Sequence, residues 1–317
     1  MQITMTIEQI LAQLDTVVDT LPREALTQAQ ARREEMTPHL LAILEKVLAA
    51  PTEVPDGYFG LHSATYLLAA FREPLAFPLF LKLCHLPSKV SDELYGETVT
   101  EDMPRILAAV CGQDADSLCA LFADGQANEY IRASATKALA VMWLDGRLSQ
   151  LEMENIFLKL LRNHPTDDDS YAITGLVDTC LDLGPAPFLT EIEGCFERDQ
   201  IEPFAFGRDS LHRALKWSPD ENRSRMAQEH YAPLIVDVAD EFEGWAWFVP
   251  KQQPSDFGKF DAPPRMLPTL REPAQTGGGG YESIVTAVPV RQISSKDKAV
   301  KKSKRAMAKQ SRKKNRR

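Results

Sequence analysis

Residues 61–87 read LHSATYLLAAFREPLAFPLFLKLCHLP, and this stretch decides the fold. It begins with a run rich in small and aliphatic residues, passes through a turn and ends in a second apolar run. Two such runs joined by a turn are typical of a helical hairpin. No run of alternating β-branched residues occurs before residue 280. We therefore expect an all-α body over residues 1–248.

The same pattern recurs along the chain. Residues 101–122 and 170–196 repeat it, and residues 131–161 repeat it with a longer turn. Aligning Ala70 with Val110, and Met142 with Cys180, gives shifts of about 40 and 38 residues. Such periods belong to HEAT and armadillo arrays, in which stacked helical pairs share one core because a single pair cannot bury its apolar face. We expect a HEAT/armadillo-like α-solenoid; an irregular helical bundle is the alternative.

Capping signals mark where several helices begin and end. In a capping box the N-cap hydroxyl and a Glu or Gln three residues later each satisfy a free backbone N–H. Glycine or proline just past an apolar run is typical of a helix end. The predicted starts lie at Thr6, Thr37-Pro38, Ser149 and Ser218, and the predicted ends at Pro51, Gly125, Gly146 and Gly184-Pro185.

Charge is distributed unevenly along the chain. The net charge of −9 combines 36 basic and 45 acidic residues, and twelve of the basic ones lie at 296–317, where Asp297 is the one acid. That segment therefore carries +11 and the remaining residues carry −20. A body this acidic repels nucleic acids and anionic membranes over most of its surface. Contact with a polyanion would have to come from the basic segment or from a local patch.

Two further segments follow the helical body. Residues 249–295, rich in Pro and Gly, predict a flexible linker, and the basic residues 296–317 predict a disordered tail. The tail could bind RNA or the ribosome through phosphate contacts, bind an acidic surface of a partner or of the body, or have no specific role. Its candidate polyanion-binding residues are Lys301, Lys302, Lys304, Arg305, Lys309, Arg312, Lys313, Lys314, Arg316 and Arg317.

A dense aromatic cluster, FEGWAWF, occupies residues 242–248. Terminal repeats need a covering element, so we expect this cluster to cover the last open face of the helical stack. The alternative is a hydrophobic patch that docks a partner, formed by Trp245, Trp247 and Phe248. If Trp245 and Trp247 are both shielded from solvent, the docking hypothesis is excluded.

The sequence carries no recognisable catalytic or cofactor-binding motif. The patterns GxxxxGK[ST], GxGxxG, GxSxG and HExxH are all missing. The five cysteines form no CxxC pair and are expected to be buried thiols of a reducing cytosol. The three acids at 167–169 are expected to stabilise the N-terminal end of the next helix through its dipole, rather than to bind a cation. We therefore expect no enzymatic activity, no cofactor and no metal.

Two features bear on localisation. No apolar run approaches the roughly 18 residues of a membrane-spanning helix. Residues 1–14 carry Glu8 and no basic residue, unlike a secretory signal. We expect a cytoplasmic protein.

Several segments of the body resemble one bacterial family. LHSATYLLAAFRE at 61–73, TEDMPRILAAV at 100–110, IRASATKALAVM at 131–142 and the FEGWAWF ending resemble the family known as domain of unknown function 1186. The resemblance covers roughly residues 5–248 and implies a helical-repeat fold with no established activity. Relatives often end in a cysteine-rich zinc motif, but no cysteine follows Cys195 here, so zinc binding is not carried over.

These expectations combine into two functional hypotheses. The first is a non-enzymatic adaptor whose helical stack presents a concave surface to a protein partner, while the tethered basic tail adds reach and electrostatic attraction. The second is an RNA- or ribosome-associated factor anchored through the tail. Partners lost on nuclease treatment would favour the second hypothesis, and partners that persist would favour the first.

Overall fold

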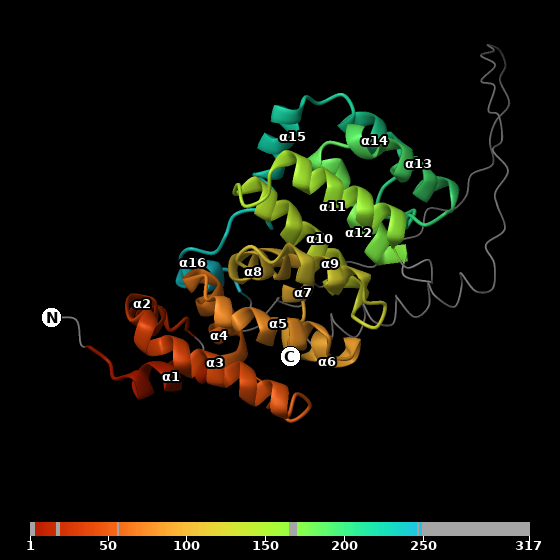
Figure 1. Cartoon of the computed structure of the whole chain (residues 1–317). Coiled ribbons are helices and arrows are strands. Elements are labelled where there is room, and N and C mark those ends of the chain that lie inside the picture. Colours follow the sequence, from red (N-terminus) through yellow and green to blue (C-terminus); the bar gives the residue numbers. More distant parts are fainter. Residues whose placement is uncertain (1–3, 17–19, 56, 165–169, 246, 249–317) are drawn as a thin grey trace, which may run out of the picture. The chain divides into compact units, whose positions relative to one another are not determined.

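The computed structural model describes residues 4–16, 20–55, 57–164, 170–245 and 247–248 (Figure 1). These residues contain sixteen α-helices and two 3-10 helices, and no strand beyond one isolated bridge between Thr16 and Tyr58. The prediction of an all-α body is confirmed for them. The predicted linker and basic tail, residues 249–295 and 296–317, and the acids at 167–169 lie outside the described residues.

The helices follow one another with short connections. They are α1 (Ile7–Asp15), α2 (Arg23–Ala31), α3 (Arg33–Ala49), α4 (Gly60–Phe71), η1 (Pro74–Ala76), α5 (Phe77–Cys84), α6 (Ser88–Tyr95), α7 (Thr98–Glu101), α8 (Met103–Val110), α9 (Ala115–Ala123), α10 (Glu129–Leu144), α11 (Gln150–Asn163), α12 (Ser170–Leu183), η2 (Ala186–Phe188), α13 (Leu189–Glu197), α14 (Arg208–Ala214), α15 (Pro219–Met226) and α16 (Val238–Phe242). The four predicted hairpins correspond to α4–α5, α8–α9, α10–α11 and α12–α13.

Local sequence signals set many of the helix boundaries. Thr6, Ser149 and Ser218 are the N-caps of α1, α11 and α15, and each forms a complete capping box. The predicted ends are also confirmed, because α3, α9, α10 and α12 each end one or two residues before the predicted Pro or Gly. Gly146 and Gly184 have φ of 86° and 98°, the left-handed conformation that closes a helix.

One predicted helix start is wrong. α3 begins at Arg33, and Pro38 lies inside it. Arg32 ends α2 and begins α3, and its guanidinium donates to Glu35 at 3.1 and 2.7 Å. This contact stabilises the first turn of α3, which lies upstream of Pro38. Pro38 therefore does not begin a helix; it lies inside α3 and removes one backbone hydrogen bond from it.

Four helices, α4, α8, α10 and α12, form the centre of the body and are called the spine helices below. α4 packs against α8, α8 against α10, and α10 against α12. Every residue of α8 is buried, as is nearly all of α4, so protein surrounds these helices on all sides. α10 and α12 approach closely at Gly175, where an added Cβ would lie 2.5 Å from the Cβ of Ala133.

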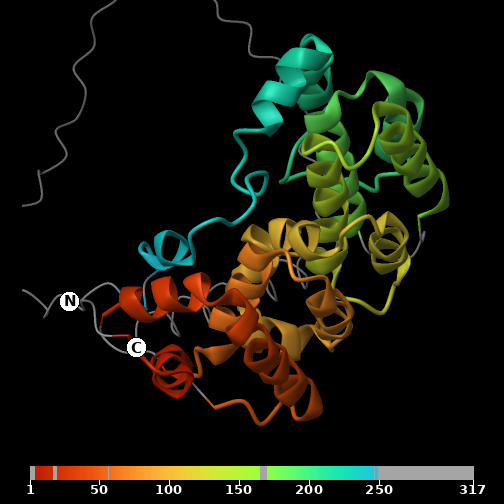
Figure 2. The same ribbon diagram turned by 60° about the vertical axis from the view of Figure 1, so that its left-hand side comes forward.

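The remaining helices flank this spine (Figure 2). α3 packs against α4, α9 and α11 pack against α10, and α14 and α15 pack against α12. α13 packs against α11. The flanking helices therefore bury the outward faces of the spine helices along one continuous core.

The chain after α15 returns to the beginning of the body (Figure 1). We call residues 227–245 and 247–248 the returning segment; it contains α16, which packs against α2 and α4. Gln30 on α2 donates to the Val236 carbonyl at 2.8 Å and accepts from the Val238 N–H at 3.0 Å. The aromatic cluster was expected to cover the last open face of the helical stack, but it covers α4 instead. Its partners lie far upstream in the chain, where no local signal identifies them.

Candidate functional site

The predicted docking residues pack against α4. The Phe59 ring centroid lies 6.2 Å from Trp245, 5.5 Å from Trp247 and 5.0 Å from Phe248. Phe248 is buried and Trp245 is half-buried, whereas Trp247 is 42% exposed. The structure therefore brings the three residues together, and mainly Trp247 remains accessible to a partner.

His62 on α4 lies beneath the same rings. Its ring centroid is 5.4 Å from Trp245 and 5.3 Å from Trp247. Nδ1 has no hydrogen-bond partner among the described residues, and burial lowers the pKa of His62 to about 4. The imidazole is therefore neutral at physiological pH, packed as an aromatic ring and closed to solvent.

A buried charge cluster fastens the returning segment to α8. Arg105 donates through Nε to Asp102 at 2.8 Å and through its terminal nitrogens to Glu241 on α16. Asp102 also accepts from the Tyr66 hydroxyl at 2.5 Å and lies 3.1 Å from His230 Nε2. The Arg105 and Asp102 side chains are only 4% and 8% exposed. These groups saturate each other, which favours a structural role over a catalytic one.

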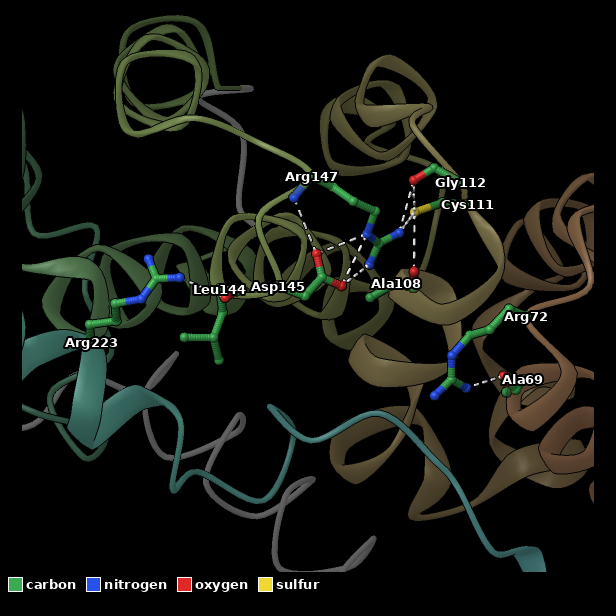
Figure 3. A network of polar contacts seen from close by, with 9 residues as sticks. All are labelled: Ala69, Arg72, Ala108, Cys111, Gly112, Leu144, Asp145, Arg147 and Arg223. Atoms are coloured by element: carbon green, nitrogen blue, oxygen red, sulfur yellow. Dashed lines mark hydrogen bonds and ion pairs between the residues drawn. The ribbon is translucent and has the colours of Figure 1, made fainter.

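Three arginines lie at the C-terminal ends of the spine helices, with Arg147 between Arg223 and Arg72 in the view of Figure 3. Arg147, in the turn after α10, donates to the Gly112 carbonyl at 2.9 Å beyond the end of α8. Arg72 is the left-handed C-cap of α4, with φ of 56°, and donates to the Ala69 carbonyl. Arg223 on α15 donates to the Leu144 carbonyl of α10 at 2.7 Å. Cations at these positions stabilise the helices, because the C-terminal end of a helix dipole is negative.

The turns after the spine helices therefore lie along one edge. We call residues 71–76, 110–114, 144–151 and 183–189, together with Arg223, the turn edge. The turns after α4 and α10 are close enough for their charges to interact: burial and the charge of Arg147 lower the pKa of the Arg72 guanidinium, and the charge of Asp145 raises it. Asn222 on α15 lies against Gly184, so the end of α12 joins the same edge.

The carboxylates and the arginines of the turn edge differ in their partners. Asp145 binds Arg147 at 2.7 Å, and Asp114 accepts from the N–H and hydroxyl of Ser117 at 2.9 and 2.7 Å. Within the described part of the chain, Arg72 and Arg223 have no carboxylate partner. Each donates to a backbone carbonyl, the charge of Asp145 also acts on Arg72, and the Arg223 guanidinium lies 4.5 Å from the centroid of the Trp143 ring.

Exposed leucines lie in three of the same turns. Leu75 follows α4 and is 65% exposed, Leu151 begins α11 and is 67% exposed, and Leu189 begins α13 and is 37% exposed. Neither these leucines nor the arginines were identified from the sequence. Arg147 directly follows the predicted helix end at Gly146, which is the one local signal among them.

Burial determines the protonation of the cysteine thiols. All five cysteines are free, four are buried as predicted, and Cys119 is half-buried. Burial raises the pKa of the Cys84 thiol to about 12 and that of Cys119 to about 11. Both are therefore protonated at neutral pH, which opposes nucleophilic use.

The surface depressions are acidic. One of about 360 Å³ is lined by Asp114, Asp116 and Glu152 among others, and one of about 350 Å³ by Glu101, Glu229 and His230. Over the described ranges, no group of three or more His, Cys, Asp or Glu side chains is placed to hold a metal ion. None of the helices described there is long and apolar enough to cross a membrane.

The ten predicted polyanion-binding residues of the basic tail lie outside the described residues. They are Lys301, Lys302, Lys304, Arg305, Lys309, Arg312, Lys313, Lys314, Arg316 and Arg317.

Comparison with known proteins identifies the family. An uncharacterized protein of Chlamydia muridarum is 30% identical over 245 residues, covering 76% of this chain and 97% of the relative. An uncharacterized protein of Chlamydia trachomatis serovar D is 30% identical over 246 residues, covering 76% of this chain and 96% of the relative. No solved structure matches. The model of a protein family of unknown function, DUF1186, matches residues 5–249, and the chain belongs to this family.

Proposed function

We propose that the chain is a cytoplasmic, HEAT-like helical scaffold that binds a protein partner and is not itself an enzyme. The proposal rests mainly on the serial packing of α4, α8, α10 and α12. When stacked helices share one core and end along one edge, equivalent surface positions recur at regular intervals along that edge. Repeated positions favour recognition of an extended segment of another protein.

The chemistry of the body supports this proposal. The thiols with raised pKa, the saturated Asp102–Arg105–Glu241 cluster and the neutral His62 favour structural roles. The exposed large hydrophobic side chains of the described residues include Leu75, Phe204, Val236 and Trp247. Such side chains are common in protein interfaces and do not form a nucleophile–base pair.

Affinity purification from bacterial lysate tests the proposal. The tagged full chain is immobilised, and bound proteins are compared with and without nuclease. We expect at least one protein to be retained after nuclease and to re-form a complex of defined stoichiometry from purified components. If no protein re-forms such a complex, the scaffold proposal is wrong.

An RNA- or ribosome-associated function is the second candidate, favoured by the +11 charge of residues 296–317. Twelve cations in one segment would release counterions from phosphates and give salt-sensitive, sequence-independent binding. Under this proposal, deleting residues 296–317 abolishes retention on RNA at low salt. Unchanged retention after the deletion would exclude it.

A further inference from the structure

We propose that the end of the returning segment is a strap that covers α4 at neutral pH and is released from it in mild acid, with His62 as the group that responds to the proton. The strap comprises residues 238–245 and 247–248, which include α16. This inference does not depend on the scaffold function, and it adds a conformational change to the helical body.

The strap is joined to the rest of the body by an extended stretch of chain. Residues 234–237 form no helix, Val236 is 76% exposed, and the chain between α15 and α16 crosses an open span (Figure 2). Arg23 on α2 and Arg105 on α8 hold the strap through ion pairs with its carboxylates. A segment held by a few side chains opens more easily than a closely packed core. Opening at residues 234–237 can therefore free the strap while the spine helices stay folded.

The strap shields His62 from water. His62 is 5% exposed, and its ring centroid lies 5.4 Å from that of Trp245 and 5.3 Å from that of Trp247. The rings of Phe59 and Tyr95 lie against it at 5.9 and 6.0 Å and belong to the rest of the body. The strap therefore supplies two of these ring contacts, and its release opens the imidazole to solvent.

The closed site offers no compensation for a charged imidazole. Among the residues that the structure describes, none donates to or accepts from Nδ1 of His62, and no charged group acts on the ring; burial alone lowers its pKa to about 4. A buried charge without a partner is strongly unfavourable. Protonation of His62 and closure of the strap therefore oppose each other, and acid favours the open strap.

The other ionisable groups on the elements around α4 have partners of their own. Tyr95 on α6 is the ionisable side chain whose ring faces His62, and its hydroxyl bonds to Thr65. The remaining groups form contacts elsewhere: Asp15 with Tyr58, Arg23 with Asp240, Arg33 with Glu73, and Asp102 and Glu241 with Arg105.

Two groups near the start of the returning segment respond to acid in the opposite sense. His230 Nε2 lies 3.1 Å from Asp102, so a proton on His230 strengthens this contact. Burial raises the pKa of Asp182, the acceptor of the Tyr231 hydroxyl, to about 6, so acid stabilises its folded environment. Both groups contact the returning segment upstream of the strap. Release of the strap in acid is therefore specific to His62.

Hydrogen exchange monitored by mass spectrometry tests the inference on the full chain at pH 7 and pH 5, with rates corrected for the intrinsic pH dependence of exchange. His62→Gln and His62→Phe both remove the titrating group, one with a polar and one with an aromatic side chain. His39→Gln, at an exposed position of α3, is the matched control. Far-UV circular dichroism reports whether the body stays helical at each pH.

A pKa of about 4 with the strap closed and the ordinary value of 6.5 with it open raise the opening constant about twentyfold between pH 7 and pH 5. We therefore expect the protection of residues 238–245 to fall about twentyfold in the wild type and in His39→Gln, and to change less than about twofold in both His62 variants. The helical signal should persist, and the amides of α10 should exchange more slowly than those of the strap.

Three results would overturn the inference. The first is equal protection of the strap at the two pH values in the wild type, or an equal loss in the His62 variants. The second is greater protection in acid that disappears in His230→Gln, which would assign the response to the contact between His230 and Asp102. The third is loss of the helical signal at pH 5, which would show unfolding of the whole body instead.

Discussion

The spine helices are almost fully buried, whereas the returning segment contributes only some buried side chains, and the two are held in different ways. α8 and α10 pack through aliphatic and small side chains against helices near them in sequence. The returning segment is held by the Arg105–Glu241 ion pair and by rings that pack edge-to-face against Phe59, and these partners lie well over a hundred residues away in sequence. The spine helices therefore depend on close packing, whereas the returning segment depends on a few specific side chains that contact residues far away in sequence.

Breaking the Arg105 cluster should have the largest effect. Arg105→Met leaves Asp102 and Glu241 without their cation and should lower the free energy of unfolding by about 4 kcal/mol, measured by urea denaturation. Arg23→Met is the control, because Arg23 also binds α16, through Asp240, but is solvent-exposed. We expect no measurable change for it. Equal effects of the two variants would contradict a buried fastening.

Crowding the spine should have the next largest effect. Gly175→Val places a Cβ 2.5 Å from that of Ala133, so α10 and α12 must separate, at a cost of about 3 kcal/mol. Gly125→Ala is the control, since an added Cβ there meets no atom within 4 Å. Thermal denaturation compares the two variants. A Gly175→Val protein as stable as the wild type would contradict the close helix packing.

His62 should make stability fall in acid. Its pKa in the folded protein is about 4, below the ordinary histidine value of 6.5, so the unfolded state takes up the proton first as the pH falls. Stability is full above 6.5 and is lost between 6.5 and 4, by about 2 kcal/mol on going from pH 7 to pH 5. His62→Phe should lack this loss. Urea denaturation at both pH values checks the difference, and parallel losses in the two proteins would contradict it.

Asp182 on α12 should act in the opposite direction. Burial, followed by the charge of Asp178, raises the pKa of Asp182 to about 6, so the folded state keeps its proton longer than the unfolded state. Its contribution is full below 3.8 and is lost as the pH rises to 6. Asp182→Asn keeps an acceptor for the Tyr231 hydroxyl and should be about 2 kcal/mol more stable than the wild type at pH 8, with no gain at pH 4. A less stable variant at pH 8 would contradict this account.

The features predicted correctly from the sequence depend on nearby residues. Thr6, Ser149 and Ser218 cap helices through contacts three residues away, so a local pattern was sufficient. Pro38 was misread because the contact that begins α3, between Arg32 and Glu35, lies upstream of it.

The features that were missed depend on distant residues. The position of the aromatic cluster depends on Phe59, and the Arg72–Arg147–Arg223 edge exists only because the ends of α4, α8 and α10 meet. The sequence alone explains an arginine just after a helix as a cap that binds the last carbonyl groups of that helix. Its neighbours across the fold are known only from the structure.

Hydrogen exchange monitored by mass spectrometry tests most directly the claim that the spine helices form one cooperative core to which the returning segment is fastened. We expect amides of α8, α10 and α12 to exchange last and together, at the free energy of global unfolding, and those of residues 235–245 to exchange at a lower free energy. Protection of the returning segment equal to that of α10, or separate exchange of α8 and α12, would contradict the account.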